Sequence, residues 1–445
     1  MKKRIIILGA GLVGSLLAIL LSEKGYEVCI YEKRSDPRKA GAESGRSINL
    51  ALSRRGKLAL QKAGVEKEVE KLIIPMEGRM MHDLSGNLTF QPYGTKGQKI
   101  YSISRSGLNE LLMTKAASAG VNINFQQRVL DVEMDIPAVV VEGAGCELIK
   151  DNADLIFGAD GAYSAVREAM RKTDRFNYSQ YYLDYGYKEL TIPATTGGDF
   201  ALSSNALHIW PRGQFMLIAL PNLDKSFTCT LFLPFSGKVS FENLKQEKEI
   251  IDFFNKNFPD AASKMPSLAK DFSTHPTGSL VTISCYPWVK NNVTILGDAS
   301  HAIVPFYGQG MNAGFEDCKT INDLLEQFPD DWEKVLAEFQ FLRKPDADAI
   351  SQLALQNFTE MRDLVGDPKF LLRKKIEAKI NSLYPEQWIP LYSMVTFSDL
   401  RYSEALHIGK QQDKVMQEVM NIPDIAKKWE QLNFQKIVNQ LKSYL

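Results

Sequence analysis

The chain has 445 residues, enough for two or three domains of ordinary size. Hydrophobic residues make up 44% and charged residues 24%, and 53 basic side chains balance 53 acidic ones, which excludes disordered and collagen-like proteins. The net charge of zero also argues against a nucleic-acid partner, because binding a polyanion requires clustered Lys and Arg.

The cysteines and the N-terminal segment indicate the compartment. Five cysteines are odd in number and widely spaced, with no CxxC pair and no Cys/His cluster, which favours a reducing compartment and no metal site. The basic start and the apolar run 5–21 resemble a signal peptide, but glycines interrupt the run and no small-residue cleavage site follows it. No other stretch approaches the ~20 apolar residues of a membrane span. We therefore expect a cytoplasmic protein without a membrane anchor.

The N-terminus has the pattern of a βαβ unit with a glycine-rich turn, which predicts a parallel sheet covered by helices. Its strand, helix and second strand are expected over 5–8, 12–23 and 28–31. In the turn, Gly9 permits the tight bend, Gly11 lets the backbone approach a pyrophosphate, and Gly14 allows close packing of the helix.

An acidic residue follows at the distance that dinucleotide sites require. Glu32 lies 18 residues after Gly14 at the end of the second strand, where a carboxylate can accept hydrogen bonds from ribose hydroxyls. This predicts an unphosphorylated ribose and hence FAD or NAD, although the neighbouring Lys33 and Arg34 weaken the distinction. A glycine turn that binds nothing is the alternative.

Two further motifs each follow an apolar strand. The first ends in Asp160 and is followed by Arg167, and the second ends in Asp298, which could accept from a ribityl hydroxyl. Each alone could be a simple strand turn. With the glycine motif and in this order, they resemble the flavoprotein aromatic hydroxylases, which carry all three on one discontinuous FAD domain. The resemblance implies FAD as the cofactor.

A glycine-rich segment over 305–314 precedes a helical run that begins near Gly310. A helix start supplies partial positive charge, which would suit the flavin edge where reduction deposits negative charge. The nearby Ser300 and His301 suggest a nucleophile and its base, but no G-x-S-x-G elbow occurs and neighbours in sequence need not meet, so we reject that interpretation.

The middle of the chain has strand-like runs, and the last quarter is helical. Strands are expected over 206–210, 215–220 and 227–233, with a hairpin turn at 221–225 between the last two. Both faces of the strand over 215–220 are apolar, so something must cover each of them. We expect one face to line a cavity. From Trp332 the pattern is helical almost to Leu445, and prolines are expected to divide it at positions 345, 368, 385 and 423.

These patterns predict an α/β protein with a Rossmann-like FAD-binding domain, a mixed β-sheet substrate domain and a C-terminal helical region. The FAD-binding domain is expected over 1–74, 100–180 and 286–330, the substrate domain over 75–99 and 181–285, and the helical region over 331–445. The residues give no signal for an oligomeric state, and no second glycine motif offers NADPH a domain of its own.

Several stretches narrow the resemblance to the kynurenine 3-monooxygenase family within these hydroxylases, from the N-terminus to about residue 401. They are 45–53, 78–82, 92–94, 208–212 and 390–397. The resemblance implies that NADPH, a transient co-substrate, reduces FAD. It implies further that O2 forms a flavin C4a-hydroperoxide, which converts the small-molecule substrate L-kynurenine to 3-hydroxykynurenine.

The resemblance also assigns residues to the substrate. Arg79 and Tyr93 match the residues that hold the amino-acid carboxylate, and an arginine fork suits a carboxylate. Asn357 and Tyr392 match residues that join substrate and flavin, with Met361 one helical turn after Asn357. The apolar box for the aminophenyl ring falls on Leu207, Met216, Leu220, Phe232 and Phe306. A surface ion pair for Arg79, a half-exposed Tyr93 and ordinary core packing of the box are the alternatives.

The FAD contacts implied by the resemblance add to the glycine motif. They fall on Val13, Tyr31, Glu32, Lys33, Arg34, Ala51, Arg105, Leu130, Asp298, Met311 and Asn312, beside Gly310 at the helix start. Two other functions stay open: hydroxylation of a different aromatic ring on the same fold, and a non-catalytic FAD-binding redox sensor.

Overall fold

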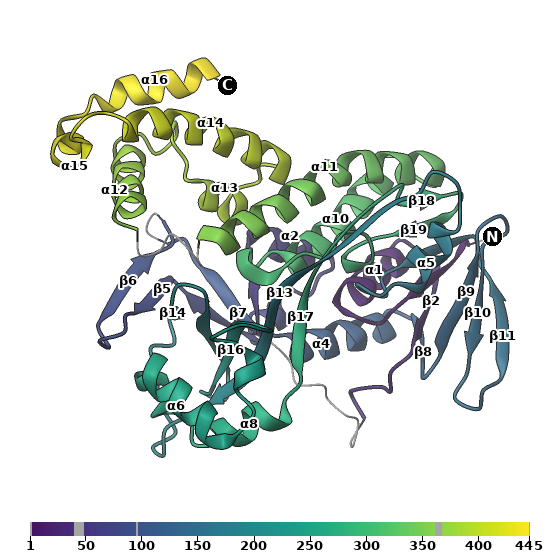
Figure 1. The fold of residues 1–445 in the computed structure, drawn as a ribbon. Helices are drawn as coiled ribbons and strands as arrows, with labels where there is room; N and C mark the ends of the chain where they lie inside the picture. The colour runs from purple at the N-terminus through teal and green to yellow at the C-terminus, as the bar shows by residue number, and fades with distance from the viewer. Residues whose placement is uncertain (1, 40–48, 95–96, 361–366, 445) are drawn as a thin grey trace.

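The computed structural model describes residues 2–39, 49–94, 97–360 and 367–444. A six-stranded sheet contains the N-terminal strand of the chain (Figure 1). The first three elements of the chain, a strand, a helix and a strand, match the predicted βαβ unit. All neighbouring strands in the sheet run parallel except the β18–β19 pair. In spatial order the strands are β18 (Val289–Lys290), β19 (Val293–Ile295), β12 (Leu155–Gly158), β1 (Arg4–Leu8), β2 (Glu27–Glu32) and β8 (Asn122–Phe125).

Helices and two small sheets cover this sheet. Helix α1 contacts both α4 and α10, and all three contribute to one large apolar core. The helices are α1 (Leu12–Glu23), α2 (Arg54–Lys62), α3 (Glu66–Val69), α4 (Arg105–Ser118), α5 (Ala165–Arg171), α9 (Asp298–His301) and α10 (Gly310–Gln327). The small sheets are β11 (Leu148–Asn152), β10 (Ala138–Glu142) and β9 (Arg128–Glu133), and β3 (Asn49–Leu52), β7 (Ile100–Ser104) and β4 (Ile73–Met76).

A mixed seven-stranded sheet forms the second layer, and only its β14–β5 pair is parallel. Its strands are β17 (Thr277–Tyr286), β13 (Asn177–Ile192), β16 (Phe227–Pro234), β15 (Met216–Pro221), β14 (Ala206–Pro211), β5 (Gly78–His82) and β6 (Leu88–Pro92). One face is covered by η1 (Phe241–Asn243), α6 (Glu247–Asn257), α7 (Pro259–Ala262) and α8 (Leu268–Thr274), which lie below it in Figure 1.

The alternation predicted along β15 is confirmed. Leu217 and Ala219 pack with Phe254 of α6 in the core beneath the helices. Met216 and Leu220 point to the opposite face and join two other apolar clusters. The predicted hairpin between β15 and β16 is also present.

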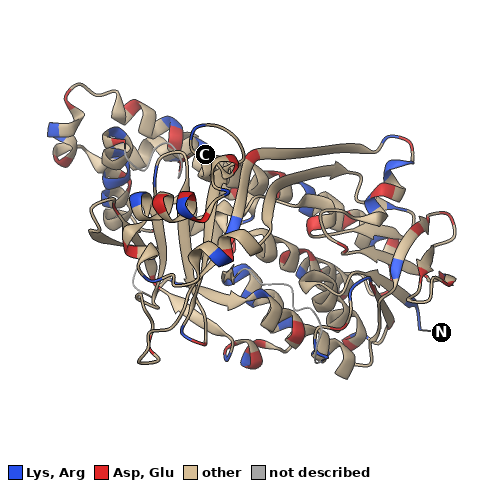
Figure 2. Ribbon diagram, turned by 60° about the horizontal axis from the view of Figure 1, so that its bottom comes forward, with Lys and Arg blue, Asp and Glu red and all other residues tan. Residues whose placement is uncertain are grey.

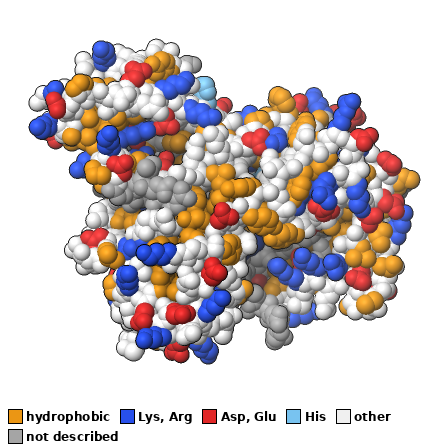
Figure 3. All heavy atoms as spheres, in the orientation of Figure 1, with side chains coloured by type: hydrophobic (Ala, Val, Ile, Leu, Met, Phe, Trp, Pro, Cys, Tyr) orange, Lys and Arg blue, Asp and Glu red, His pale blue; other side chains and the backbone are white. Residues whose placement is uncertain are grey.

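The chain from residue 332 is helical, and its last helices form a lobe that projects from the body (Figures 1 and 3). The short helix η2 (Pro305–Tyr307) comes before α10. From residue 332 the elements are α11 (Trp332–Thr359), α12 (Pro368–Leu383), α13 (Leu391–Phe397), α14 (Tyr402–Met420), α15 (Ile425–Lys428), η4 (Trp429–Gln431) and α16 (Phe434–Tyr444). Basic and acidic residues are mixed along the ribbon (Figure 2).

One predicted helix boundary is wrong. Pro345 lies inside α11, whereas Pro368 begins α12 and the other two prolines follow helix ends. A proline removes one helical hydrogen bond, but Pro345 is on the exposed side of α11, where the freed carbonyl of Phe341 can face water. The neighbouring Arg343 is buried and fixes the helix by ion pairs to α10.

Within the described ranges, no helix is both long enough and apolar enough to cross a membrane.

Candidate functional site

The three cofactor motifs lie together at one edge of the six-stranded sheet. β1, β12 and β19 are adjacent and parallel, so their carboxyl ends bring Gly9, Asp160 and Gly297 to the same edge. A Cβ added to Gly9, whose φ is +101°, would lie 2.7 Å from the carbonyl oxygen of Ala159. This edge is where α/β proteins bind nucleotides. The fold thus joins motifs that are far apart in the sequence.

The glycine turn has the shape that a pyrophosphate needs. A Cβ on Gly14 would lie 2.0 Å from the carbonyl oxygen of Gly9, so only glycine lets α1 pack this closely against the turn. A Cβ on Gly11 would meet no protein atom within 4 Å. Gly11 therefore faces open space at the N-terminus of α1, where backbone N–H groups attract phosphate.

Glu32 lies beside this turn. Its Oε2 accepts a hydrogen bond from the Ala10 N–H at 2.9 Å, and its Oε1 accepts from the Arg34 N–H at 2.9 Å. The carboxylate is half-buried, while the side chains of Lys33 and Arg34 are exposed. These contacts fix the Glu32 carboxylate beside the glycine turn.

The two aspartates at the sheet edge differ in exposure. Asp160 is oriented by the Ala165 N–H at 2.6 Å, its Oδ1 is buried with no partner among the described residues, and burial raises its pKa. Asp298 begins α9 and is exposed. Beside it, Gly297 and Gly314 leave room for Val13, because a Cβ on either would lie 3.1 or 2.7 Å from the Val13 side chain. Asp298 is therefore the more exposed of the two carboxylates.

Arg105 begins α4 and is exposed, four residues before Asn109. The Asn109 amide donates to the Ala10 carbonyl at 3.2 Å, so this face of α4 turns toward the glycine motif. Leu130 lies on β9 with 45% of its surface exposed. Tyr31 donates its hydroxyl to Asp151, so its side chain is engaged on the β11 side of β2.

The start of α10 packs on β3 through a buried amide. Asn312 donates to the carbonyls of Ala51 and Gly308 at 2.8 and 2.9 Å, and its Oδ1 accepts from the Ser53 N–H at 2.9 Å. Three protein partners therefore fix the orientation of this side chain. Met311 and Gly310 form the first turn of the same helix.

A buried ion network supports the sheet edge from behind. Asp317 of α10 accepts from the Gly297 N–H at 2.9 Å, His301 at 2.6 Å and Arg343 of α11 at 2.8 Å. Burial would raise the pKa of Asp317, but the charges of His301 and Arg343 outweigh it and lower that pKa. Asp346 links Arg343 to Arg401, which precedes α14. No sequence pattern predicted this network. The Ser300 hydroxyl donates to the Gly297 carbonyl and not to His301. This agrees with our rejection of Ser300 and His301 as a nucleophile and its base.

Arg79 lies against two stacked tyrosines. Its guanidinium carbon is 4.6 Å from the ring centre of Tyr392 and 5.6 Å from that of Tyr93, and the two rings stack 5.5 Å apart. Burial disfavours the charge, but Tyr392 and Tyr93 outweigh it and raise the pKa of Arg79. No carboxylate of the described residues forms an ion pair with it, and the buried Tyr93 hydroxyl has no hydrogen-bond partner among them.

The predicted apolar box falls into two adjoining clusters. Tyr93, Leu207, Leu220 and Tyr392 share one, which also includes Ala51. Met216, Phe232 and Phe306 share the other, and Ile218 and Tyr392 belong to both. Leu207 is the strand partner of Arg79, and Met216 that of Phe232. The structure therefore brings together the described members of the predicted substrate set, and Asn357 contacts the box through the backbone of Phe306.

Asn357 donates to the carbonyl of Phe306 at 2.6 Å, and Met361 lies outside the described residues. Two aromatic side chains join this site although the sequence assigned them no role. Tyr307 stacks on Tyr392 at 5.6 Å, and Phe358 lies 4.4 Å from Phe306 between ring centres. Their positions next to Phe306 and Asn357 in the sequence were the only available signal.

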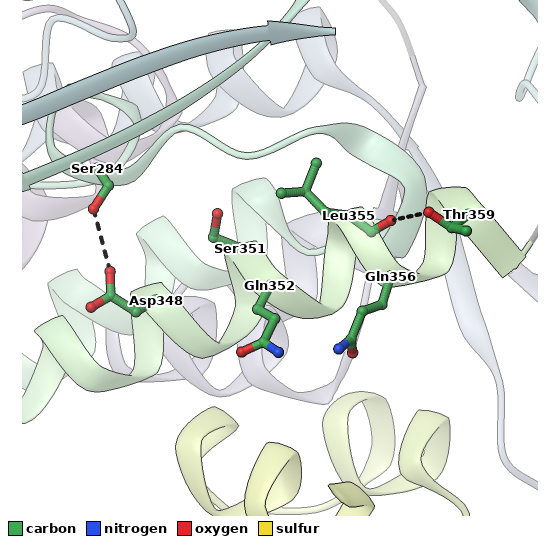
Figure 4. A pocket seen from close by; sticks show the side chains of 7 residues that line it. All are labelled: Ser284, Asp348, Ser351, Gln352, Leu355, Gln356 and Thr359. Atoms are coloured by element: carbon green, nitrogen blue, oxygen red, sulfur yellow. Dashed lines mark hydrogen bonds between the residues drawn. The ribbon is translucent and has the colours of Figure 1, made fainter. Parts of the chain in front are cut away.

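Two hollows flank α11. An open one of about 500 Å³, shown in Figure 4, lies between α11 and β17 and has mainly polar side chains. Its lining residues are Ser284, Asp348, Ser351, Gln352, Leu355, Gln356 and Thr359. A smaller and more enclosed cavity reaches the box, and its lining residues are Tyr185, Gly213, Gln214, Phe215, Met216, Phe232 and Phe358.

Comparison with known proteins agrees with this arrangement. A family model described as an FAD binding domain matches residues 2–328. The kynurenine 3-monooxygenase of Christiangramia forsetii is 50% identical over 444 residues, covering 99% of this chain and 99% of that one. The chain belongs to the kynurenine 3-monooxygenase family. The Sus scrofa kynurenine 3-monooxygenase is 46% identical over 420 residues, 93% of this chain and 88% of that one.

The kynurenine 3-monooxygenases are flavin-dependent monooxygenases, so this family member is a flavin-dependent aromatic hydroxylase. The fold extends further. A solved structure of 2-methyl-3-hydroxypyridine-5-carboxylic acid oxygenase matches with a TM-score of 0.68 and 20% identity, covering 82% of this chain and 94% of its own.

Proposed function

We propose that this chain hydroxylates L-kynurenine to 3-hydroxykynurenine, consuming NADPH and O2 and releasing NADP⁺ and water. The observation that carries the proposal is Arg79, a cation packed against the rings of Tyr93 and Tyr392 without an anionic protein partner in the described ranges. A buried guanidinium of this kind is suited to a ligand carboxylate, which it can bind through two parallel hydrogen bonds.

The apolar box supports an aromatic substrate next to that carboxylate. Leu207 adjoins Arg79 across two strands, and Met216, Phe232 and Phe306 extend the apolar surface away from the charge. An amino acid with an aminophenyl ketone side chain has this order of groups: a charged end and a flat ring. The box also excludes water from the carbon that is hydroxylated.

The residues at the sheet edge fit FAD. The open space at Gly11, the exposed Asp298 and the oriented Glu32 would hold its pyrophosphate, ribityl chain and ribose. Bound FAD would supply hydride uptake from NADPH and activation of O2. The chain itself binds and orients the substrate. The aniline nitrogen already activates the neighbouring ring carbon, so the protein needs no strong base there.

The test is anaerobic mixing of the purified holoenzyme with NADPH, with and without L-kynurenine, followed by air and product analysis. We expect faster bleaching of the flavin with L-kynurenine and one 3-hydroxykynurenine per NADPH. A different hydroxylated ring as the preferred product, or flavin that never yields a hydroxylated product, would refute the proposal.

A further inference from the structure

A chain of buried hydrogen bonds runs beneath β5 and β14, on the face opposite Arg79. Asp260 of α7 is 2.6 Å from His82 Nδ1, and His82 Nε2 is 2.8 Å from His208 Nδ1. His208 Nε2 is 2.7 Å from the backbone carbonyl of Ser203. Only 1% of the surface of each histidine is exposed. Both histidines belong to the segments that carry the family resemblance, yet the proposed chemistry uses neither.

This chain needs one more hydrogen than its neutral components provide. It has three hydrogen bonds and an acceptor at each end, the Asp260 carboxylate and the Ser203 carbonyl. Each bond requires one hydrogen, so the two imidazoles must supply three, but two neutral imidazoles carry only two. An additional proton is therefore bound within the chain.

The proton resides on His82. Burial would raise the pKa of Asp260, but hydrogen bonds from His82 and Trp210 outweigh it and lower that pKa, so Asp260 is anionic. Burial lowers the pKa of His208 to about 4, so His208 is neutral. His82 can then donate from both ring nitrogens, and it stacks 3.9 Å from Trp210.

Two other charged groups, Arg212 and Asp83, lie next to the backbone of His82. Arg212, which follows β14, donates to the carbonyl oxygens of His82 and Asn257, and its pKa is lowered by burial. Asp83 directly follows His82 and is exposed. Arg212 therefore binds the end of β5 without replacing the proton in the chain.

His82 bonds the end of the strand that carries Arg79 to α7 and to β14. Within β5 only Gly78 and His82 are buried, and all five residues of the neighbouring edge strand β6 are exposed. Gly78 has no side chain and Arg79, Met80 and Met81 are half-buried, so His82 has the most deeply buried side chain of β5. The next strand has the same arrangement, with His208 adjacent to Leu207, the strand partner of Arg79.

We propose that His82, protonated and bound between Asp260 and His208, is a positioning residue that fixes Arg79 for the substrate carboxylate. The inference rests on the proposed function of Arg79. Without this proton, two imidazole lone pairs would face each other or the bond to Ser203 would be lost, so β5 would loosen. Binding of L-kynurenine should then weaken while the aromatic box stays intact.

The protonation state can be read directly in the FAD-loaded full chain. Five histidines make a long-range ¹H–¹⁵N spectrum of ¹⁵N-histidine protein assignable, with His82→Gln and His208→Gln identifying the two signals. We expect two protonated nitrogens on His82 and one, Nε2, on His208 at pH 7. A His82 signal with a single protonated nitrogen at pH 7 would refute the protonated state of His82 and overturn the proposal.

Binding measurements test the link to Arg79. We expect His82→Gln to weaken L-kynurenine binding about tenfold at pH 7. The decarboxylated amine analogue of L-kynurenine should bind both proteins equally, since it does not need Arg79. His275→Gln is the matched control, because His275 is also buried but bonds to β13. Asp260→Asn serves as the second variant if His82→Gln does not fold.

The outcomes separate the two proposals. Equal loss of affinity for the substrate and the amine analogue, or an additive effect when combined with Arg79→Ala, would indicate general damage and overturn the positioning role. Unchanged L-kynurenine affinity in both variants, with Arg79→Ala impaired, would overturn it as well. A wild type that does not bind L-kynurenine would overturn the proposed function and this inference together.

Discussion

Replacing Arg79 with alanine should weaken L-kynurenine binding without removing the flavin. The guanidinium lies 4.6 and 5.6 Å from the Tyr392 and Tyr93 ring centres, and it belongs to none of the three cofactor motifs. Removing one partner of a buried, hydrogen-bonded charge pair costs about 2 to 5 kcal/mol. At 1.4 kcal/mol per decade, the Kd should rise by roughly 1.5 to 3.5 decades.

The free protein should tolerate this change better than the complex does. In the described residues no carboxylate pairs with Arg79, so its removal strands no buried anion and costs mainly the contacts with two aromatic rings. Each such contact is worth about 0.5 to 2 kcal/mol. Titration of the oxidised flavin spectrum with L-kynurenine gives the Kd, and urea unfolding gives the stability.

Two variants control the experiment. Arg79→Lys keeps the charge but loses the planar fork, so its Kd should fall between the wild-type and alanine values. Arg171→Ala removes a side chain that is 55% exposed and paired with Glu168, so its Kd should match the wild type. If Arg79→Ala binds L-kynurenine within twofold of the wild type, the carboxylate assignment is wrong.

Three further predictions concern the cofactor edge. Gly11→Ala should fold but carry little flavin, because its Cβ meets no protein atom and would occupy the space of the pyrophosphate; normal flavin absorbance in the purified variant would contradict this. Gly14→Ala should lose stability as well, by about 1 to 3 kcal/mol or more in urea unfolding, because its Cβ would lie 2.0 Å from the Gly9 carbonyl oxygen. Asp317→Asn should lose about 3 to 5 kcal/mol at pH 7, since it leaves Arg343 and His301 without their shared anion. Its pKa is lowered in the folded state, so this stabilisation is present above the ordinary value of about 3.9 and is lost as pH falls below it. The deficit of Asp317→Asn should therefore shrink in acid, and a deficit that is constant down to pH 3 would contradict the assignment.

Local patterns predicted the elements that are fixed by neighbours in sequence. The glycine turn, the helix over 12–23 and the hairpin after β15 are confirmed because turn chemistry and hydrophobic periodicity determine them. The same reasoning failed at Pro345, where tertiary ion pairs to Arg343 outweigh the local preference of proline for helix ends. The predicted domain limits at 180 and 285 fall inside β13 and β17, which are single strands running across them.

The site itself was only partly accessible from the sequence. Arg79 and Tyr93 came from family resemblance, since an isolated arginine or tyrosine has no pattern of its own. The pairing of His82 with Asp260 was missed because 178 residues separate them and only the sheet register brings them together. The expected flavin contact at Asn312 stays a prediction, and the sequence did not indicate that its side chain also joins α10 to β3 by hydrogen bonds.

The ion network behind Gly297 has a consequence for how the protein is made. Asp317 reaches Gly297, Arg343 reaches Asp317, and Asp346 holds Arg401, so the loop beside Asp298 is braced by side chains far downstream. A nascent chain on the ribosome cannot close this brace until α14 has emerged. Flavin capture should therefore be a late event in biosynthesis, and fragments that stop before residue 401 should accumulate as apoprotein even though every nucleotide-binding motif has already been translated.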